Sequence, residues 1–207
     1  MKTILFQGDS ITDVFRSREF DNNTGMGYAR LVHAEVGYNY PEQYVFLNRG
    51  MGGHRSVDLY ARIKRDILNL KPDIMSILIG VNDVWQEITD STGVDADRYL
   101  QIYSMIIEET KAALPDIKIM ILEPFVVQGS ATTEHWDCFR SEVELRAKIA
   151  KEISEKYGLV FVPLQKKFDE LTKKASPEYW VRDGVHPTAM GHHLIKEEWI
   201  KAFETLK

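Results

Sequence analysis

The stretch TILFQGDSITD, residues 3–13, joins an apolar run to a glycine, an aspartate and a serine. The run TILF is nearly continuous rather than alternating, which is typical of a strand buried on both faces of a parallel sheet. Gly8 lets the chain turn sharply after this strand and leaves room around the Ser10 hydroxyl. Because Asp9 and Ser10 belong to the residue types that cap helices, a purely structural role for this turn is an open alternative.

Four further apolar runs follow the first along the chain, at 44–47, 74–79, 118–122 and 159–162. Between the runs lie segments with apolar residues at helical spacing, within 60–70, 96–113, 143–157 and 195–206. Strands that alternate with helices predict a three-layer α/β/α sandwich, with helices on both faces of a parallel sheet. No linker, repeat or low-complexity segment interrupts the pattern, so we expect a single domain over residues 1–207.

The composition limits the classes of function. The chain has 207 residues, 44% of them hydrophobic, and a net charge of -5, which suits one compact core and argues against a nucleic-acid partner. No apolar run is long enough to span a bilayer, and the start of the chain is too weakly basic and apolar for a signal peptide. The single cysteine, Cys138, excludes an internal disulfide and lies in a polar stretch. We therefore expect a cytoplasmic protein without a membrane partner.

The residues that follow the strands are candidates for chemistry, because ligands of such folds bind beyond the carboxyl ends of the strands. After the second run, Gly50, Gly52 and Gly53 free backbone N–H groups that could bind an oxyanion, although a flexible loop explains them equally. After the third run, Asn82 offers a side-chain amide donor, but it could simply form a turn. The spacings of phosphate-binding and dinucleotide-binding glycine loops are absent.

A second polar motif, RDGVHP at residues 182–187, lies near the end of the chain. Gly184 and Pro187 indicate a turn that directs the side chains of Asp183 and His186. A carboxylate that orients an imidazole is half of a nucleophilic site, and Ser10 would complete it. The spacing GxSxG of the ordinary α/β-hydrolase nucleophile is absent, so we expect a shallower site at the first strand–helix turn.

The ordered set of motifs resembles the GDSL-type SGNH hydrolases. The four blocks of that family correspond here to FQGDSITD, NRGMGG, IGVND and RDGVHP, and they span nearly the whole chain. The first block reads GDSI rather than GDSL, a mild change that should leave the serine unaffected. The stretches IGVNDVW, PFVVQG and DGVHPTAMGH are similar to those of bacterial carbohydrate acetylesterases, including acetylxylan esterases. The resemblance implies the SGNH hydrolase fold, with a flavodoxin-like five-stranded parallel sheet.

The resemblance also implies a mechanism without a metal or cofactor. Ser10 would be the nucleophile, His186 its base, and Asp183 the group that orients the imidazole. The oxyanion would be held by the N–H groups of Ser10 and Gly53 and by the Asn82 side chain. Some members of the family orient the histidine with a backbone carbonyl, so we rank Asp183 below Ser10 and His186.

The expected substrate is an acetylated carbohydrate, above all acetylated xylo-oligosaccharides, cleaved through an acyl-enzyme. Trp85, Trp180 and His54 are predicted to contact it, although core packing explains the tryptophans equally well. The resemblance implies a homo-oligomer.

Several alternatives remain. Within the family they are a thioesterase, a lysophospholipase and an arylesterase, and outside it a carbohydrate-binding protein without activity. A metal-dependent phosphodiesterase would use Asp9, Asp13, Asp183 and His186.

Overall fold

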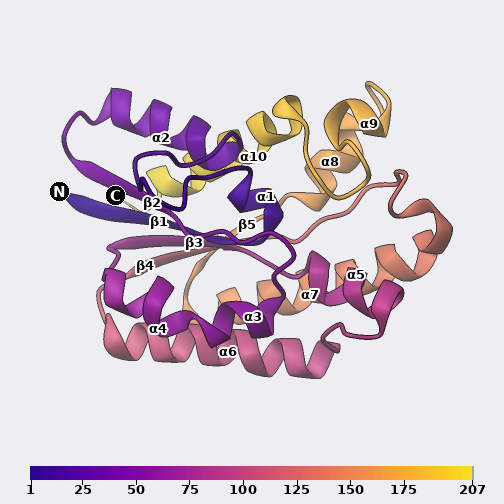
Figure 1. Cartoon of the computed structure of the whole chain (residues 1–207), viewed down its shortest axis with the longest axis horizontal. Helices are drawn as coiled ribbons and strands as arrows, with labels where there is room; N and C mark the ends of the chain where they lie inside the picture. The colour runs from indigo at the N-terminus through magenta and orange to yellow at the C-terminus, as the bar shows by residue number, and fades with distance from the viewer. Residues whose placement is uncertain (207) are drawn as a thin grey trace.

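The computed structural model describes residues 1–206, and its centre is a parallel sheet of five strands (Figure 1). The strands are β1 (Lys2–Gly8), β2 (Tyr44–Asn48), β3 (Ile74–Leu78), β4 (Lys118–Leu122) and β5 (Val160–Val162). They lie in the order β2-β1-β3-β4-β5, which is the flavodoxin-like order. The predicted fold class is confirmed, and each of the five apolar runs forms a strand.

Alternating burial explains why the runs are continuously apolar. In β1, Ile4 and Phe6 belong to the core on one face of the sheet, whereas Leu5 belongs to the core on the other face. In β4, Met120 and Ile121 divide between the two cores in the same way. Successive side chains of a strand point to opposite faces, and here both faces are covered, so most positions of the runs are apolar.

Helices cover both faces of the sheet (Figure 1). One face carries α1 (Ser10–Asp13), α2 (Tyr28–Asn39), α8 (Gln165–Leu171), α9 (Pro177–Trp180) and α10 (Ala189–Glu204). The other carries α3 (Ser56–Ala61), α4 (Ile63–Asp66), α5 (Val81–Asp90), α6 (Ala96–Ala113) and α7 (Trp136–Tyr157), with short 3-10 turns at Leu68–Leu70 and Thr133–His135. The helices predicted at 96–113, 143–157 and 195–206 are present. Within residues 1–206, no helix combines the length and apolarity that a membrane crossing requires.

The segment 60–70 differs from its prediction, because one continuous helix is replaced by α3, α4 and a 3-10 turn. The apolar stripe is in place, since Ile63 and Ile67 are buried in the core beneath α6. The break falls at Arg62, whose buried guanidinium donates hydrogen bonds to the carbonyl oxygens of Gly8 and Arg49. These carbonyls lie at the carboxyl ends of two strands, and binding them turns the chain at Arg62 out of a regular helix.

Candidate active site

The turn after β1 presents the Ser10 hydroxyl at the start of α1. Asp9 caps this helix, because its Oδ1 accepts a hydrogen bond from the Ile11 N–H at 2.9 Å. Gly8 precedes them with φ +155°, and a Cβ at this position would lie 2.3 Å from the carbonyl oxygen of Leu78. Glycine is therefore required where β1 passes β3, and Asp9 has the helix-capping role that its residue type allows.

The loop that follows α9 presents Asp183 and His186. A bridge between Val181 and Pro187 closes the loop, and the Arg182 N–H donates to the His186 carbonyl at 2.9 Å. Inside the loop, the Asp183 Oδ1 accepts the N–H groups of Val185 at 3.0 Å and His186 at 2.8 Å. These hydrogen bonds fix the loop around the Asp183 carboxylate. The His186 ring is therefore held next to that carboxylate.

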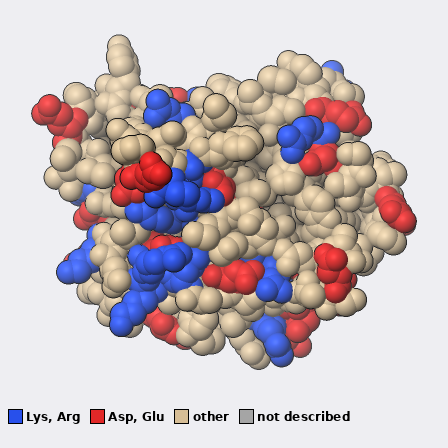
Figure 2. All heavy atoms as spheres, in the orientation of Figure 1, with Lys and Arg blue, Asp and Glu red and all other residues tan. Residues whose placement is uncertain are grey.

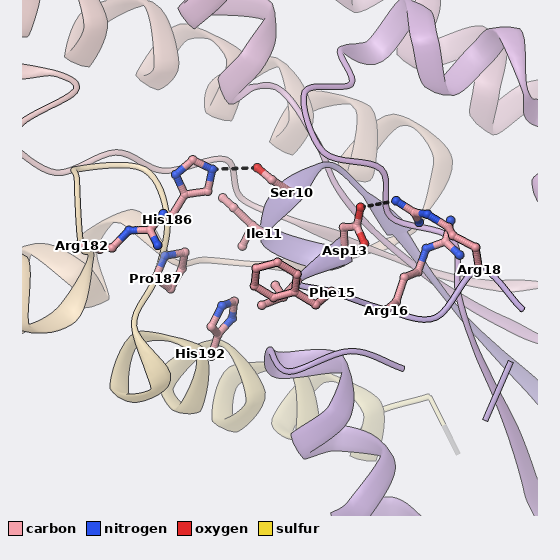
Figure 3. Close-up of a pocket in the computed structure, with 11 residues that line it drawn as sticks. Ser10, Ile11, Asp13, Phe15, Arg16, Arg18, Arg182, His186, Pro187 and His192 are labelled. Atoms are coloured by element: carbon pink, nitrogen blue, oxygen red, sulfur yellow. Dashed lines mark hydrogen bonds and ion pairs between the residues drawn. The ribbon is translucent and has the colours of Figure 1, made fainter. Parts of the chain in front are cut away.

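The structure brings Ser10, His186 and Asp183 together into one hydrogen-bonded chain. The Ser10 Oγ lies 3.0 Å from the His186 Nε2, although the two residues are 176 positions apart (Figure 3). On the other side of the ring, the His186 Nδ1 lies 2.7 Å from the Asp183 Oδ2. Burial by itself raises the pKa of the Asp183 carboxyl, but the hydrogen bonds from the His186 ring and from backbone N–H groups outweigh it and hold that pKa well below its usual range.

The three predicted oxyanion donors gather beside the serine. Ser10, Gly53, Asn82 and His186 line one shallow cavity of about 330 Å³. Among residues 1–206, the N–H groups of Ser10 and Gly53 donate to no other group of the chain. The Asn82 Nδ2 donates to the His54 carbonyl at 3.1 Å, which orients the amide. Such a cavity can accept a small polar group next to the Ser10 hydroxyl.

Asp13 connects the serine helix to the glycine loop, a role that the sequence analysis missed. Its Oδ2 accepts the Gly52 N–H at 3.1 Å and forms an ion pair with Arg18 at 2.6 Å. Gly52 directly precedes Gly53, while Asp13 lies in the same short helix as Ser10. A possible signal was the spacing of three residues between Ser10 and Asp13, which places both side chains on one helical face.

Two other aspartates near the site are buried and have raised pKa values. Burial raises the pKa of Asp9 to about 7, against the opposing effect of the Ile11 N–H, and its Oδ2 has no hydrogen-bond partner within the described residues. Burial also raises the pKa of Asp83 to about 6, against hydrogen bonds from the Ser56 hydroxyl and N–H. Of these two carboxyl groups, Asp83 is the better satisfied.

The three residues predicted to contact the substrate lie in different environments in the structure. Trp85 lines the cavity of the oxyanion donors, and its ring centroid lies 5.8 Å from that of His186. Trp180 instead packs against the core, and its indole nitrogen is buried without a partner among the described residues. The His54 Nδ1 accepts a hydrogen bond from the Arg62 Nε at 3.2 Å. Neither Trp180 nor His54 lines a cavity with Ser10, within residues 1–206.

A second, larger cavity of about 480 Å³ is also lined by Ser10 and His186 (Figure 3). Its apolar lining comes from Ile11, Val14, Phe15 and Pro187, and its polar lining includes Asp13, Arg16, Arg18, Arg182 and His192. His192 is buried and its Nδ1 accepts the Tyr28 N–H at 3.2 Å, whereas the neighbouring His193 is exposed. Burial and the nearby His186 lower the pKa of His192 to about 4, so its ring is neutral at pH 7.

No metal-ligand cluster forms in the described part of the chain. Within residues 1–206, no group of three or more histidine, cysteine, aspartate or glutamate side chains is arranged to hold a metal ion. Asp9, Asp13 and Asp183 are each directed to a different partner, at Ile11, Arg18 and His186. These side chains therefore do not converge as ligands of one ion.

Known proteins similar to this chain share this architecture. Residues 6–194 match the GDSL-like lipase/acylhydrolase family. An acetylxylan esterase from Geobacillus stearothermophilus is 32% identical over 208 residues, which cover 96% of this chain and 92% of the relative. The crystal structure of a GDSL-like lipase from Parabacteroides merdae has a TM-score of 0.93 and 34% identity, covering 100% of this chain and 96% of that one.

The solved structure of Axe2, an acetylxylan esterase from Geobacillus stearothermophilus, has a TM-score of 0.87 and 31% identity, covering 97% of this chain and 93% of that one. Two further structures of Axe2 are catalytic mutants, in which alanine replaces an aspartate and a serine respectively. Both the family match and the near-complete coverage of these relatives lead to the same assignment. The chain belongs to the GDSL-like lipase/acylhydrolase family and is a carboxylic ester hydrolase.

Proposed function

We propose that the protein is a serine esterase that removes short acyl groups, above all acetyl, from carbohydrate, with acetylated xylo-oligosaccharides as substrates. The observation that carries this proposal is the chain of hydrogen bonds from Ser10 through His186 to Asp183. It lies beside two backbone N–H groups, of Ser10 and Gly53, that bind nothing else within residues 1–206.

The proposed reaction begins with attack of the Ser10 Oγ on the ester carbonyl. His186 Nε2, 3.0 Å away, takes the hydroxyl proton and then passes it to the leaving sugar oxygen as the acyl–oxygen bond breaks. Asp183 accepts a hydrogen bond from the Nδ1–H group of His186, which fixes the tautomer of the ring and stabilises its cationic form. Water, deprotonated by the same histidine, then attacks the acyl-serine and releases the acid.

The tetrahedral oxyanion would be stabilised by the N–H groups of Ser10 and Gly53 and by the Asn82 amide. Gly53 has φ +78° with no atom within 4 Å of a Cβ position, and its carbonyl accepts a hydrogen bond from the Gln86 side chain at 2.6 Å. The amide of Asn82 is already oriented by the His54 carbonyl. Donors that are oriented before the reaction stabilise developing charge without reorganising, which is why one such donor is typically worth about 10²–10³ in kcat.

In this proposal each of the two cavities holds one part of the substrate. The acyl group enters the smaller cavity, which is bounded by Trp85, Gln86, Thr89 and Asp90. The polar side chains of Gln86, Thr89 and Asp90 suit a short acyl group better than a long apolar chain. The larger cavity beyond Ser10, about 480 Å³, takes the sugar that leaves.

The relatives support the carbohydrate assignment. The acetylxylan esterase at 32% identity spans nearly all of this chain. In Axe2 the catalytic mutants replace a serine and an aspartate, which are the residue types at Ser10 and Asp183. Thioesterase, lysophospholipase and arylesterase activities are the alternatives within the family, and a binding protein without activity is the alternative outside it. Self-association and a cytoplasmic location remain predictions.

Acetate release from acetylated xylo-oligosaccharides, measured beside hydrolysis of p-nitrophenyl acetate, tests the proposal. We expect the wild type to cleave both and Ser10→Ala to lose at least about 10³-fold in kcat/KM on each. Ser141→Ala, an exposed serine on α7, is the matched control and should keep both activities. Cleavage of p-nitrophenyl acetate alone would keep the nucleophile but reject the sugar, and thioesters and lysolipids would be tested next. Full activity in Ser10→Ala would reject the serine mechanism.

A further inference from the structure

The larger cavity beside Ser10 has an excess of positive charge. Its lining contains the three arginines Arg16, Arg18 and Arg182, but the single carboxylate of Asp13. Arg16 and Arg18 lie on one side, Arg182 lies with His186 on the opposite side, and Phe15 lies between them (Figure 3). Basic side chains also concentrate into one patch on the face of the molecule shown in Figure 2, although the chain as a whole carries a net charge of -5.

Arg16 is a buried cation without a carboxylate partner in residues 1–206. It is 8% exposed, and it donates to the carbonyl oxygens of Gly50 at 2.8 Å and Ser17 at 3.3 Å. Burial, with the nearby charge of Arg18, lowers the pKa of Arg16 to about 10, so the guanidinium stays charged at neutral pH. A charge removed from water is unfavourable unless an opposite charge compensates it, and a bound anion would supply that charge.

The other two arginines leave the cavity positive. Arg18 pairs with Asp13 at 2.6 Å, but the same carboxylate oxygen also accepts the Gly52 N–H. The side chain of Arg182 is 73% exposed, and its contact with Asp183 is long, at 3.6 Å. Asp183 is moreover engaged by the His186 ring. Asp13 therefore acts on Arg16 only through space, and neither carboxylate forms an ion pair with Arg16.

Phe15 stands exposed at the point where two cavities meet. It is 84% exposed, and it lines both the Ser10 cavity and a neighbouring one formed with Asn22, Asn23, Gly25, Met26 and Arg30. Phe15 has φ +60° and Val14, which is β-branched, has φ +31°. Such backbone angles are unfavourable for these residue types and cluster at ligand sites. The exposed phenyl ring offers a flat apolar face to a sugar ring.

We propose that the acylated carbohydrate this site binds is acidic, with a sugar-acid carboxylate that Arg16 and Arg18 bind while a sugar ring packs on Phe15. This inference rests on the proposed function and names its substrate class. A carboxylate is favoured because its two oxygens match the planar fork of a guanidinium. Arg182, on the opposite side of the cavity, adds to the positive potential that attracts the substrate.

The first test compares two acetylated xylo-oligosaccharides that differ only in a glucuronic acid side group. We expect kcat/KM to be at least about tenfold higher for the acidic one, and the difference to shrink as salt is added. Hydrolysis of p-nitrophenyl acetate, which lacks the carboxylate, is measured in parallel. If both oligosaccharides are cleaved equally well, the proposed function stands and this inference is wrong. If only p-nitrophenyl acetate is cleaved, the carbohydrate assignment fails and this inference fails with it.

A second test uses inhibition of p-nitrophenyl acetate hydrolysis by glucuronate, glucose and inorganic phosphate at equal ionic strength. Glucuronate should inhibit at a concentration at least about tenfold lower than glucose does. Phosphate as effective as glucuronate would show a general anion site and overturn the sugar-acid assignment. An equal effect of glucuronate and glucose would overturn the role of the carboxylate.

Substitutions locate the carboxylate site. Arg18→Gln should lower the ratio of acidic to neutral kcat/KM about tenfold, because a ratio cancels any general loss of activity. Arg98→Gln removes the same charge from an exposed position on α6 and should leave the ratio unchanged. Should Arg18→Gln fold poorly without its Asp13 ion pair, Arg16→Lys, which keeps the charge but loses the planar fork, replaces it and should also lower the ratio. A ratio that stays at the wild-type value in these variants rejects the site.

Discussion

Asp9 directly precedes Ser10, and Asp183 lies three residues before His186. The two carboxyl groups nevertheless have opposite surroundings in the structure. Asp9 is buried at the end of β1, and one of its oxygens has no partner within residues 1–206. Asp183 lies in a half-buried loop, where its oxygens accept bonds from the His186 ring and two backbone N–H groups.

The pKa values follow from these surroundings. Burial dominates at Asp9 and raises its pKa to about 7, whereas hydrogen bonds overcome burial at Asp183 and lower its pKa. At neutral pH the Asp9 carboxyl is therefore only partly ionised, whereas the Asp183 carboxylate is charged, beside the histidine that must become cationic during the proposed reaction. Adjacency to a reactive residue in the sequence does not decide the role of an aspartate, but its hydrogen bonds do.

The largest expected effect is on activity in Asp183→Asn. The amide keeps the shape of the side chain but offers no charge to the His186 imidazolium and can select the wrong tautomer, so kcat should fall about 10³–10⁴-fold. Hydrolysis of p-nitrophenyl acetate measures this, with Asp9→Asn as the comparison at the other end of the site. If Asp183→Asn lost less than about tenfold, a backbone group would be orienting His186 and the contrast between the two aspartates would disappear.

The next largest expected effect is the pH dependence of the free energy of unfolding that Asp9 causes. The folded protein holds the Asp9 proton up to about pH 7, while the unfolded chain releases it near the ordinary value of 3.8. Between these pH values the folded state binds more protons, so the free energy of unfolding should fall as the pH rises, by at most about 4 kcal/mol from this group. Asp83, whose pKa is also raised, contributes with the same sign up to about pH 6.

Urea unfolding at pH 5 and pH 7.5 measures this effect. Asp9→Asn should flatten the fall in stability, whereas Asp97→Asn, at an exposed position on α6, should leave it in place. Asp183 has the opposite sign, since its lowered pKa adds stability above pH 4 that is lost on acidification below that value. If the free energy of unfolding of Asp9→Asn fell with pH as steeply as that of the wild type, other groups in the folded state would be stabilising the charged Asp9 carboxylate.

Asp13 is a third aspartate near the site, and its substitution should have a smaller effect on activity. Its carboxylate binds the Gly52 N–H and Arg18 rather than a reactive side chain, so we regard it as a positioning residue for the Gly53 N–H. Asp13→Ala should lower kcat about tenfold with little change in KM, because a misplaced oxyanion donor affects mainly the transition state. Asp13→Asn keeps an acceptor for the Gly52 N–H and should recover most of kcat. If KM rose instead in both variants, the carboxylate would act on substrate binding.

Much of the fold and of the candidate site could be predicted from the sequence alone. The five apolar runs predict the strands because a sheet covered on both faces favours apolar side chains on both faces of each strand. The serine, glycine and asparagine motifs follow β1, β2 and β3, at the edge where a parallel sheet collects its ligands, whereas the histidine motif follows α9. These features are local, so the residues near Ser10 or Asn82 are sufficient to indicate them.

Other features were decided only by the tertiary structure. The helix predicted at 60–70 breaks because Arg62 binds carbonyl groups of two other segments, and no local pattern contains those partners. Trp180 packs against the core, because the placement of α9 on the sheet directs its side chain there. The uncompensated charge of Arg16 likewise exists only because folding places it apart from every carboxylate that could pair with it in residues 1–206. Periodicity and turn chemistry act over a few residues, whereas burial and charge balance depend on segments that only the folded chain brings together.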